Sequence, residues 1–84
     1  MRNMTKEEIF DKVKTILVDH TQYKEPEKLT MDSKLREDLN VDSLDSFEII
    51  YDIESELQIQ VPDEDAATFA TIGDIVAYIS QKIG

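Results

Sequence analysis

One serine hydroxyl stands out among the side chains that can form a covalent bond. Ser43 lies in the run Val41-Asp42-Ser43-Leu44-Asp45, directly behind an aspartate of the kind that begins helices. Acidic residues dominate the segment that follows, and Lys82 is the only basic residue after residue 36. This arrangement presents a hydroxyl for modification and surrounds it with a surface that attracts positively charged proteins.

The same residues argue against catalysis and against a dedicated metal site. A serine needs a nearby base to act as a nucleophile, but His20 is the only histidine and lies outside the segment around Ser43, and no Gly-x-Ser-x-Gly turn is present. The chain has no cysteine, which removes a thiolate nucleophile, a disulfide framework and a cysteine-based zinc site. The acidic clusters lack the glycine and closing glutamate of an EF-hand. We expect a non-catalytic protein without a metal site and assign His20 no role.

Charge is distributed unevenly along the chain. Residues 1–36 hold eight of the nine Lys and Arg against seven acids, which nets +1, whereas residues 37–84 hold twelve acids and one lysine, which nets −11. Phosphates repel such a surface, so nucleic acid and anionic membranes are disfavoured as partners, and proteins with Lys/Arg patches are favoured. The first ten residues are charged and predict neither a signal peptide nor a membrane span, so we expect a cytoplasmic protein.

The apolar spacing predicts an all-α fold, a small bundle of three main helices and one short helix with a long first loop. A first helix starts at the capping box of Thr5 and Glu8 and ends near residue 20. A polar stretch and the long loop lead to a second helix from Asp42, a short turn covers 63–67, and a last helix starts at Thr71 with Asp74. Eighty-four residues make one domain, 1–84, with a thin core.

The second helix has three faces when its residues are placed at the helical repeat. The core face consists of Ile49, Ile50, Ile53 and Leu57. An acidic face consists of Asp45, Glu48, Asp52 and Glu56, of which the first three are expected to point into solvent. A second apolar stripe lies between them and consists of Leu44, Phe47 and Tyr51. We expect Leu44 and Tyr51 to be partly exposed and Phe47 to be mostly covered, and we expect the stripe and the acidic face together to bind partners.

The residues around Ser43 resemble the modification motif of acyl carrier proteins. The similar residues run from Glu37-Asp38-Leu39-Asn40 through Val41-Asp42-Ser43-Leu44-Asp45-Ser46-Phe47-Glu48, and the similarity returns in Val61-Pro62-Asp63-Glu64 and Thr71-Ile72-Gly73-Asp74. It covers the chain from about Leu35 to Ile79. One departure is Asn40, where the family often has glycine, but asparagine tolerates the left-handed backbone that such a turn uses.

The resemblance implies that a 4'-phosphopantetheine arm is attached to Ser43, within the motif that Asp42 and Leu44 complete. It also implies that acyl groups are bound to the thiol of this arm as thioesters. A phosphodiester at a first helical turn is favoured by unpaired N–H groups and by the helix dipole. The implied role is carriage in bacterial fatty acid biosynthesis, as a monomer. The implied partners are a phosphopantetheinyl transferase and acyl-group synthases and transferases with basic docking patches. Ser46 lacks the Asp-x-Leu frame, so we reject it as the attachment residue.

An acyl chain would leave water only by entering between the helices, where each buried methylene contributes roughly 0.8 kcal/mol. The apolar residues expected to line that space are Phe47, Ile50, Ile53, Val61, Phe69, Ile72 and Val76. Carriage of polyketide, D-alanyl or aminoacyl groups remains an alternative. So do a non-covalent acidic adaptor that docks through the stripe of Leu44, Phe47 and Tyr51, and a small calcium-responsive protein.

Overall fold

The computed structural model describes residues 4–83. Its elements are helices α1 (Lys6–Thr21), α2 (Ser43–Leu57), α3 (Asp63–Ala66) and α4 (Ile72–Ile83), with a 3₁₀ turn at Pro26–Lys28. Within this range the only pairing of extended backbone is an isolated bridge between Lys34 and Thr71. The predicted all-α fold with a long first loop is therefore confirmed. No helix among the described residues has the length and apolar character needed to cross a membrane.

Local hydrogen bonds fix where the main helices begin. The Thr5 hydroxyl accepts from the Glu8 N–H at 3.1 Å while the Glu8 carboxylate accepts from the Thr5 N–H at 2.9 Å, which is the predicted capping box of α1. The predicted pair of Thr71 and Asp74 bonds in the same reciprocal way at the start of α4. These contacts satisfy amides that the helices themselves leave unpaired.

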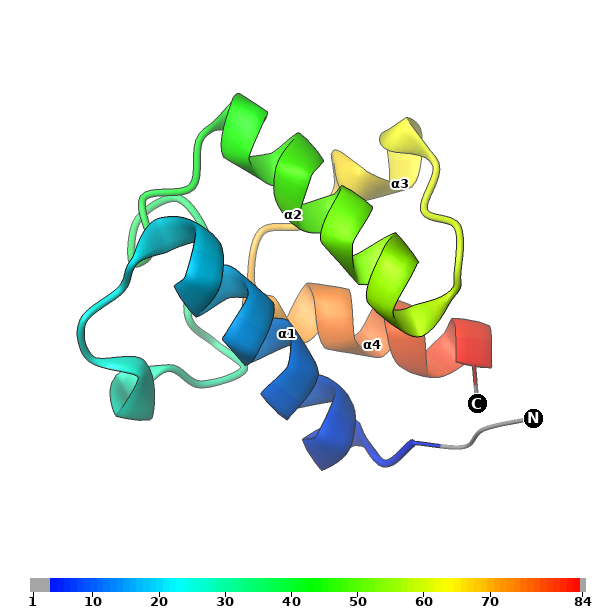
Figure 1. Ribbon diagram of the computed structural model, residues 1–84, viewed down its shortest axis with the longest axis horizontal. Coiled ribbons are helices and arrows are strands. Elements are labelled where there is room, and N and C mark those ends of the chain that lie inside the picture. The colour runs from blue at the N-terminus through cyan, green and yellow to red at the C-terminus, as the bar shows by residue number, and fades with distance from the viewer. Residues whose placement is uncertain (1–3, 84) are drawn as a thin grey trace.

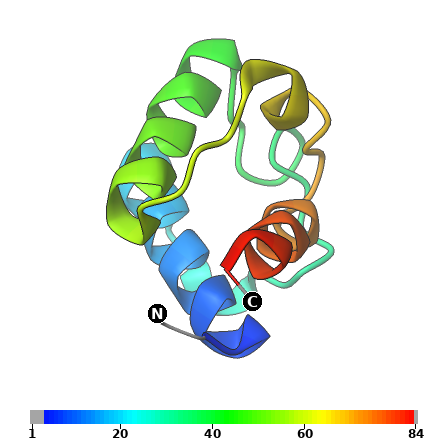
Figure 2. The same cartoon turned by 90° about the vertical axis from the view of Figure 1, so that its right-hand side faces the viewer.

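The core lies where α1 packs against both α2 and α4. Figure 1 shows these three helices around one interior, and in Figures 1 and 2 the short helix α3 lies above α4. The side chains with no exposed surface come from all three long helices: Ile9, Val13, Leu17, Ile53, Ile72 and Val76. Burying such aliphatic side chains is the main source of stability in a domain of this size.

The long first loop is tied to the start of α4. The Leu35 N–H donates to the Ala70 carbonyl at 3.0 Å, and the Gly73 N–H donates to the Met31 carbonyl at 2.8 Å. A Cβ atom at Gly73 would lie 2.9 Å from that carbonyl oxygen, so a side chain would prevent the close approach. The loop also buries its own aliphatic side chains, Leu29, Leu35, Leu39 and Val41. The loop is thereby held in place up to the residue before Asp42.

Candidate attachment site and docking face

Ser43 is the first residue of α2, and its side chain is exposed. Asp42 precedes it in an extended conformation, and its carboxylate accepts from the Asp45 N–H at 2.8 Å. The Asp45 carboxylate accepts in return from the Asp42 N–H at 3.3 Å. The sequence-predicted pair of aspartates therefore forms a capping box that starts the helix at the serine.

The turn before Ser43 is set by one left-handed residue and one buried one. Asn40 has φ 60°, in the region where asparagine is among the few tolerated residues. Val41 is 4% exposed, and its N–H donates to the Leu35 carbonyl at 2.9 Å. Val41 is buried whereas Asp42 and Ser43 are exposed, so the chain passes from the core to the surface here, and Ser43 lies in solvent at the N-terminal end of α2.

The first turn of α2 suits a negatively charged substituent. The N–H groups of Ser43 and Leu44 donate no hydrogen bond to any described residue, and the positive end of the helix dipole lies at this position. The Ser43 hydroxyl likewise has no hydrogen-bond partner among residues 4–83, so it is free to be esterified. A phosphodiester on Ser43 is therefore compatible with the local geometry. Ser46 is half-buried and lines an interior hollow.

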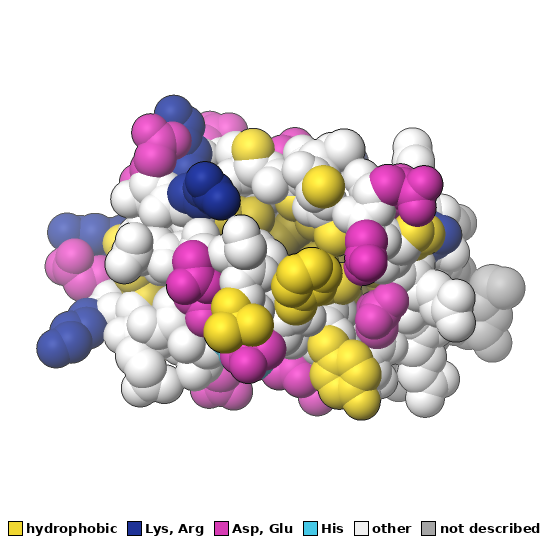
Figure 3. Space-filling view, turned by 90° about the horizontal axis from the view of Figure 1, so that it is seen from above, with side chains coloured by type: hydrophobic (Ala, Val, Ile, Leu, Met, Phe, Trp, Pro, Cys, Tyr) yellow, Lys and Arg dark blue, Asp and Glu magenta, His cyan; other side chains and the backbone are white. Residues whose placement is uncertain are grey.

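The apolar stripe on α2 is uncovered along its whole length. Leu44, Phe47 and Tyr51 are 68%, 61% and 71% exposed. The prediction that Phe47 would be mostly covered is wrong, because α1 and α3 both pack on other sides of α2. Residue Ala66 of α3 lies near Ser46, and α1 contacts the acidic side of α2. Seen from above, apolar side chains are interspersed with acidic ones on this face, and basic side chains gather towards one end (Figure 3).

The acidic face is divided between solvent and α1. The His20 imidazole is hydrogen-bonded to the Asp52 carboxylate, its Nδ1 lies 3.8 Å from Glu48, and Lys12 Nζ lies 3.2 Å from Glu56. Glu56 is exposed and pairs with Lys12 at the surface, whereas Asp52 is partly buried against His20, so the expectation that Asp52 faces solvent is wrong. No signal in the sequence indicates the His20–Asp52 and Lys12–Glu56 pairs, whose members lie 32 and 44 positions apart.

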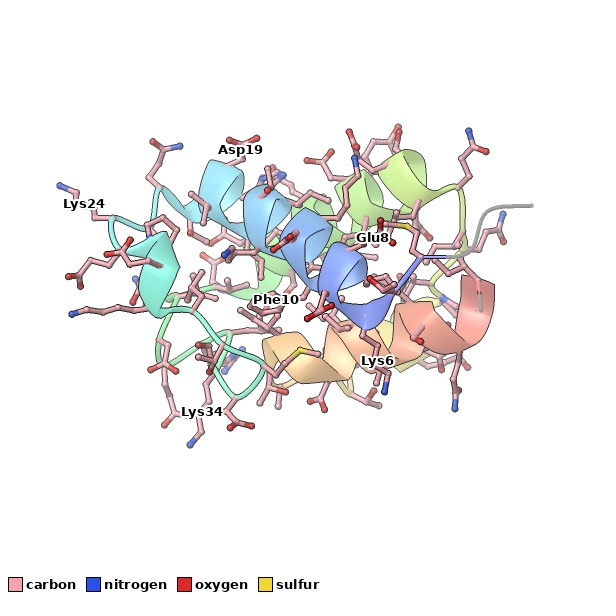
Figure 4. The ribbon with its side chains drawn as sticks, turned by 90° about the horizontal axis from the view of Figure 1, so that it is seen from below. Lys6, Glu8, Phe10, Asp19, Lys24 and Lys34 are labelled. Atoms are coloured by element: carbon pink, nitrogen blue, oxygen red, sulfur yellow. The ribbon has the colours of Figure 1, made fainter. Side chains whose placement is uncertain are left out.

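Basic side chains are found mainly on α1 and on the long first loop. Figure 4 shows the opposite side from Figure 3, where the labelled Lys6, Lys24 and Lys34 lie on α1 and on the long first loop. Lys28 and Lys34 form short-range ion pairs with Glu25 and Glu37, at 3.1 and 3.5 Å.

Next to the stripe, a shallow groove of about 440 Å³ is lined by His20, Phe47, Glu48, Tyr51 and Asp52. It offers aromatic surface beside carboxylates, which is the environment that arginine side chains prefer.

The interior next to α3 contains a hollow of about 30 Å³. Two residues predicted to line an acyl cavity, Ile50 and Phe69, line this hollow together with Ser46 and Ala66. Of the other residues predicted for the cavity, Ile53, Ile72, Val76 and Val61 are buried but are not among its lining residues. Phe47 lies outside, on the exposed stripe.

Comparison with known proteins gives concordant matches. A family model described as "Phosphopantetheine attachment site" matches residues 11–79, which include Ser43. A Clostridium perfringens protein named "Acyl carrier protein" is 47% identical over 73 residues, covering 87% of this chain and 95% of the relative. Proteins of the same name from Borrelia garinii subsp. bavariensis and Thermosynechococcus vestitus are 41% and 40% identical, over 96% and 95% of this chain and 100% and 98% of theirs.

Proposed function

The chain belongs to the acyl carrier protein family, whose members carry a covalently attached 4'-phosphopantetheine group, and we propose that Ser43 holds this group here. The observation that carries the proposal is the exposed hydroxyl at the first position of α2, beside two unpaired N–H groups. The protein is a carrier: the terminal thiol of the arm supplies the thioester linkage that a chain without cysteine cannot make with its own side chains.

The residues around Ser43 have separate parts in this role. Asp42 and Asp45 hold the first turn in place through their capping box, so the hydroxyl keeps a fixed position for a modifying enzyme. The N–H groups of Ser43 and Leu44 favour a negative charge on the serine oxygen. The buried Val41 anchors the preceding turn. None of these groups acts as a base, so the reaction chemistry belongs to the partner enzymes.

The proposed cargo is a fatty acyl chain in fatty acid biosynthesis. The support is the predominantly apolar lining of the hollow beside α2, to which Ile50 and Phe69 both contribute. An alkyl chain gains free energy by leaving water for such a space, and a polar aminoacyl group does not. Stability should therefore rise from the arm-only form to short- and medium-chain acyl forms. A flat series of unfolding midpoints would instead favour polyketide, D-alanyl or aminoacyl carriage.

Family members serve a phosphopantetheinyl transferase and acyl-handling enzymes, and we propose that these enzymes dock on α2 through Leu44, Asp45, Phe47, Glu48 and Tyr51. The support is the exposure of the three apolar side chains next to Glu48, whose carboxylate is also exposed. Partners with Lys/Arg patches are attracted at long range, and the apolar stripe then provides area for close contact. Asp52 and Glu56 would contribute less, since Asp52 is already hydrogen-bonded to His20 and Glu56 already pairs with Lys12 on α1.

The proposal is tested by attaching the phosphopantetheine arm enzymatically and then measuring the intact mass of the protein. A phosphopantetheinyl transferase with coenzyme A and magnesium should add one arm to the wild-type chain and to Ser46→Ala, and none to Ser43→Ala. Ser46→Ala is the matched control because it removes the same group three residues away on the same helix. An arm on Ser43→Ala would overturn the assignment. A bare mass for every variant, with partner binding retained, would favour the non-covalent adaptor that docks through the exposed stripe.

A further inference from the structure

Helix α3 is attached to the rest of the fold mainly at the two ends of its segment. It has four residues, and none of them is buried. At the leading end Val61 is buried, and its N–H donates to the Glu54 carboxylate at 2.8 Å. At the trailing end the Ala70 N–H donates to the Asp74 carboxylate at 2.9 Å. Between these anchors the segment 62–69 could swing outward without exposing a fully buried side chain of its own.

One side chain holds the middle of this segment. The Tyr78 hydroxyl on α4 donates to the Asp65 carboxylate on α3 at 2.7 Å. The Tyr78 ring packs edge-to-face against Phe69, with ring centroids 5.4 Å apart and planes at 69°. Lys82 Nζ lies 5.4 Å from the centre of the same ring. Tyr78 therefore contacts α3 through its hydroxyl and contacts Phe69, three residues beyond the end of α3, through its ring.

The segment held by Tyr78 forms one wall of the interior hollow. Ala66 and Phe69 provide that wall, and Ser46 and Ile50 on α2 lie among the residues that enclose the same space. The hollow of about 30 Å³ has room for roughly one water-sized group. An alkyl chain of several carbons therefore does not fit this hollow as it stands, and movement of this wall away from α2 would enlarge it.

We propose that Tyr78 and Asp65 form a latch that holds the segment 62–69 over the interior and sets how readily an acyl cargo enters. Both are positioning residues, because they act through the wall formed by Ala66 and Phe69 and do not touch Ser43. The effect on cargo rests on the proposed carrier function. The latch itself is a property of the unmodified chain and can be measured without an arm.

The first experiment measures amide hydrogen exchange in the unmodified protein. Five amides of the segment are hydrogen-bonded within it and serve as reporters: Asp65, Ala66, Ala67, Thr68 and Phe69. Tyr78→Phe removes only the hydroxyl and keeps the ring contacts with Phe69 and Lys82. It should accelerate exchange at these amides roughly tenfold, which is the factor expected when local opening no longer breaks a hydrogen bond to a charged group. Exchange rates in α1 and α2 should stay the same.

Two further variants keep the result interpretable. Asp65→Asn retains an acceptor and removes its charge, so it should accelerate the same amides by a smaller factor. Glu64→Gln is the control, because it makes the same charge change at the adjacent exposed position of α3. Unchanged exchange in Tyr78→Phe, or an equal increase in every helix, would overturn the latch, since the second result describes a general loss of stability.

The second experiment tests the link to cargo. Wild-type and Tyr78→Phe proteins are loaded with the bare arm and with short- and medium-chain acyl groups, and their unfolding midpoints are compared. The rise in unfolding midpoint from the arm-only form to the acyl form should be larger in Tyr78→Phe. In that variant the wall opens at a lower free-energy cost, so more of the free energy gained by burying the acyl chain stabilises the folded state. Equal increments in the two proteins would overturn the control of cargo entry. Failure of the arm to attach would be a separate result and would count against Ser43.

Discussion

The imidazole of His20, one residue before the end of α1, is hydrogen-bonded to the carboxylate of Asp52 in the middle of α2. The His20 side chain is 21% exposed and that of Asp52 48% exposed, so water screens the contact only in part. Together with the Lys12–Glu56 pair at 3.2 Å, it joins α1 to the acidic side of α2. The long first loop thus begins from a helix end that is fixed to the helix carrying Ser43.

This contact predicts a measurable coupling between the two helices. His20→Gln and Asp52→Asn should each lower the free energy of unfolding by about 1 kcal/mol, the usual net value of such a hydrogen bond. The double variant should lose less than the sum, with a coupling energy of about 0.5 kcal/mol or more in urea unfolding. The pair of His20→Gln and Glu48→Gln is the control, since these groups are 3.8 Å apart. Strict additivity at Asp52 would contradict the coupling.

Charge reversal should separate docking from folding. Glu48→Lys should slow association with a phosphopantetheinyl transferase by roughly tenfold at low salt and leave the circular dichroism melt nearly unchanged, because Glu48 is exposed. Asp52→Lys should also lower the melting temperature, because it removes the carboxylate to which His20 is hydrogen-bonded. Glu27→Lys, an exposed acid in the 3₁₀ turn, makes the same charge change as a control.

Added salt gives an independent check on that prediction. Screening should reduce the wild-type association rate more than that of Glu48→Lys, because the variant has already lost part of the attraction. Equal association rates for wild-type and Glu48→Lys proteins would mean that this face is only a solvated surface.

The contribution of Asp74 to the free energy of unfolding should depend on pH and be largest near neutral pH. Hydrogen bonds from the backbone N–H groups of Ala70 and then Thr71 lower the pKa of Asp74 below its ordinary value of 3.8. A depressed pKa means that the carboxylate stabilises the fold above about pH 4 and that this contribution is lost as the pH falls through the lowered pKa. Asp74→Ala should cost about 1 kcal/mol near neutral pH, the typical value of a helix cap.

Urea unfolding at several pH values checks this expectation. The difference between wild-type and Asp74→Ala proteins should shrink in acid. Asp32→Ala is the control, because the exposed Asp32 carboxylate accepts no hydrogen bond from any described residue. A difference that persists unchanged in acid would show that the charge of Asp74 is irrelevant to its role.

The contribution of Tyr78 to the free energy of unfolding should depend on pH in the alkaline range. Its hydrogen bond to Asp65, with burial and the nearby negative charge adding to it, raises the pKa of Tyr78 from 10 to about 12. A raised pKa means that the neutral hydroxyl stabilises the fold fully below pH 10 and that this contribution is lost between about pH 10 and 12. The difference in unfolding free energy between wild-type and Tyr78→Phe proteins should decline over that interval.

Ultraviolet titration of the phenolate gives the direct reading of this group. Subtracting the Tyr78→Phe curve from the wild-type curve isolates Tyr78, and Asp65→Asn should move its pKa back towards 10. A pKa of Tyr78 that is the same in Asp65→Asn as in the wild type would mean that the bond to Asp65 is not formed in solution.

The sequence alone predicts the helix starts and the core face of each helix, because both depend on interactions between residues three or four positions apart. The capping pairs Thr5/Glu8 and Asp42/Asp45 are visible in the sequence because a capping box is local, and they fix where α1 and α2 begin. The apolar repeat identifies the core side of each helix for the same reason. The position of Ser43 at the start of a helix needed no tertiary information.

The tertiary structure decided what each remaining face meets. The exposure of Phe47, the His20–Asp52 contact and the Tyr78–Asp65 bond depend on which segments pack beside α2 and α4. A helical repeat specifies the faces of its own helix, but the neighbour that covers a face is chosen by the packing of the whole core. That packing leaves Phe47 in solvent, turns part of the acidic face towards α1, and places a four-residue helix over the interior.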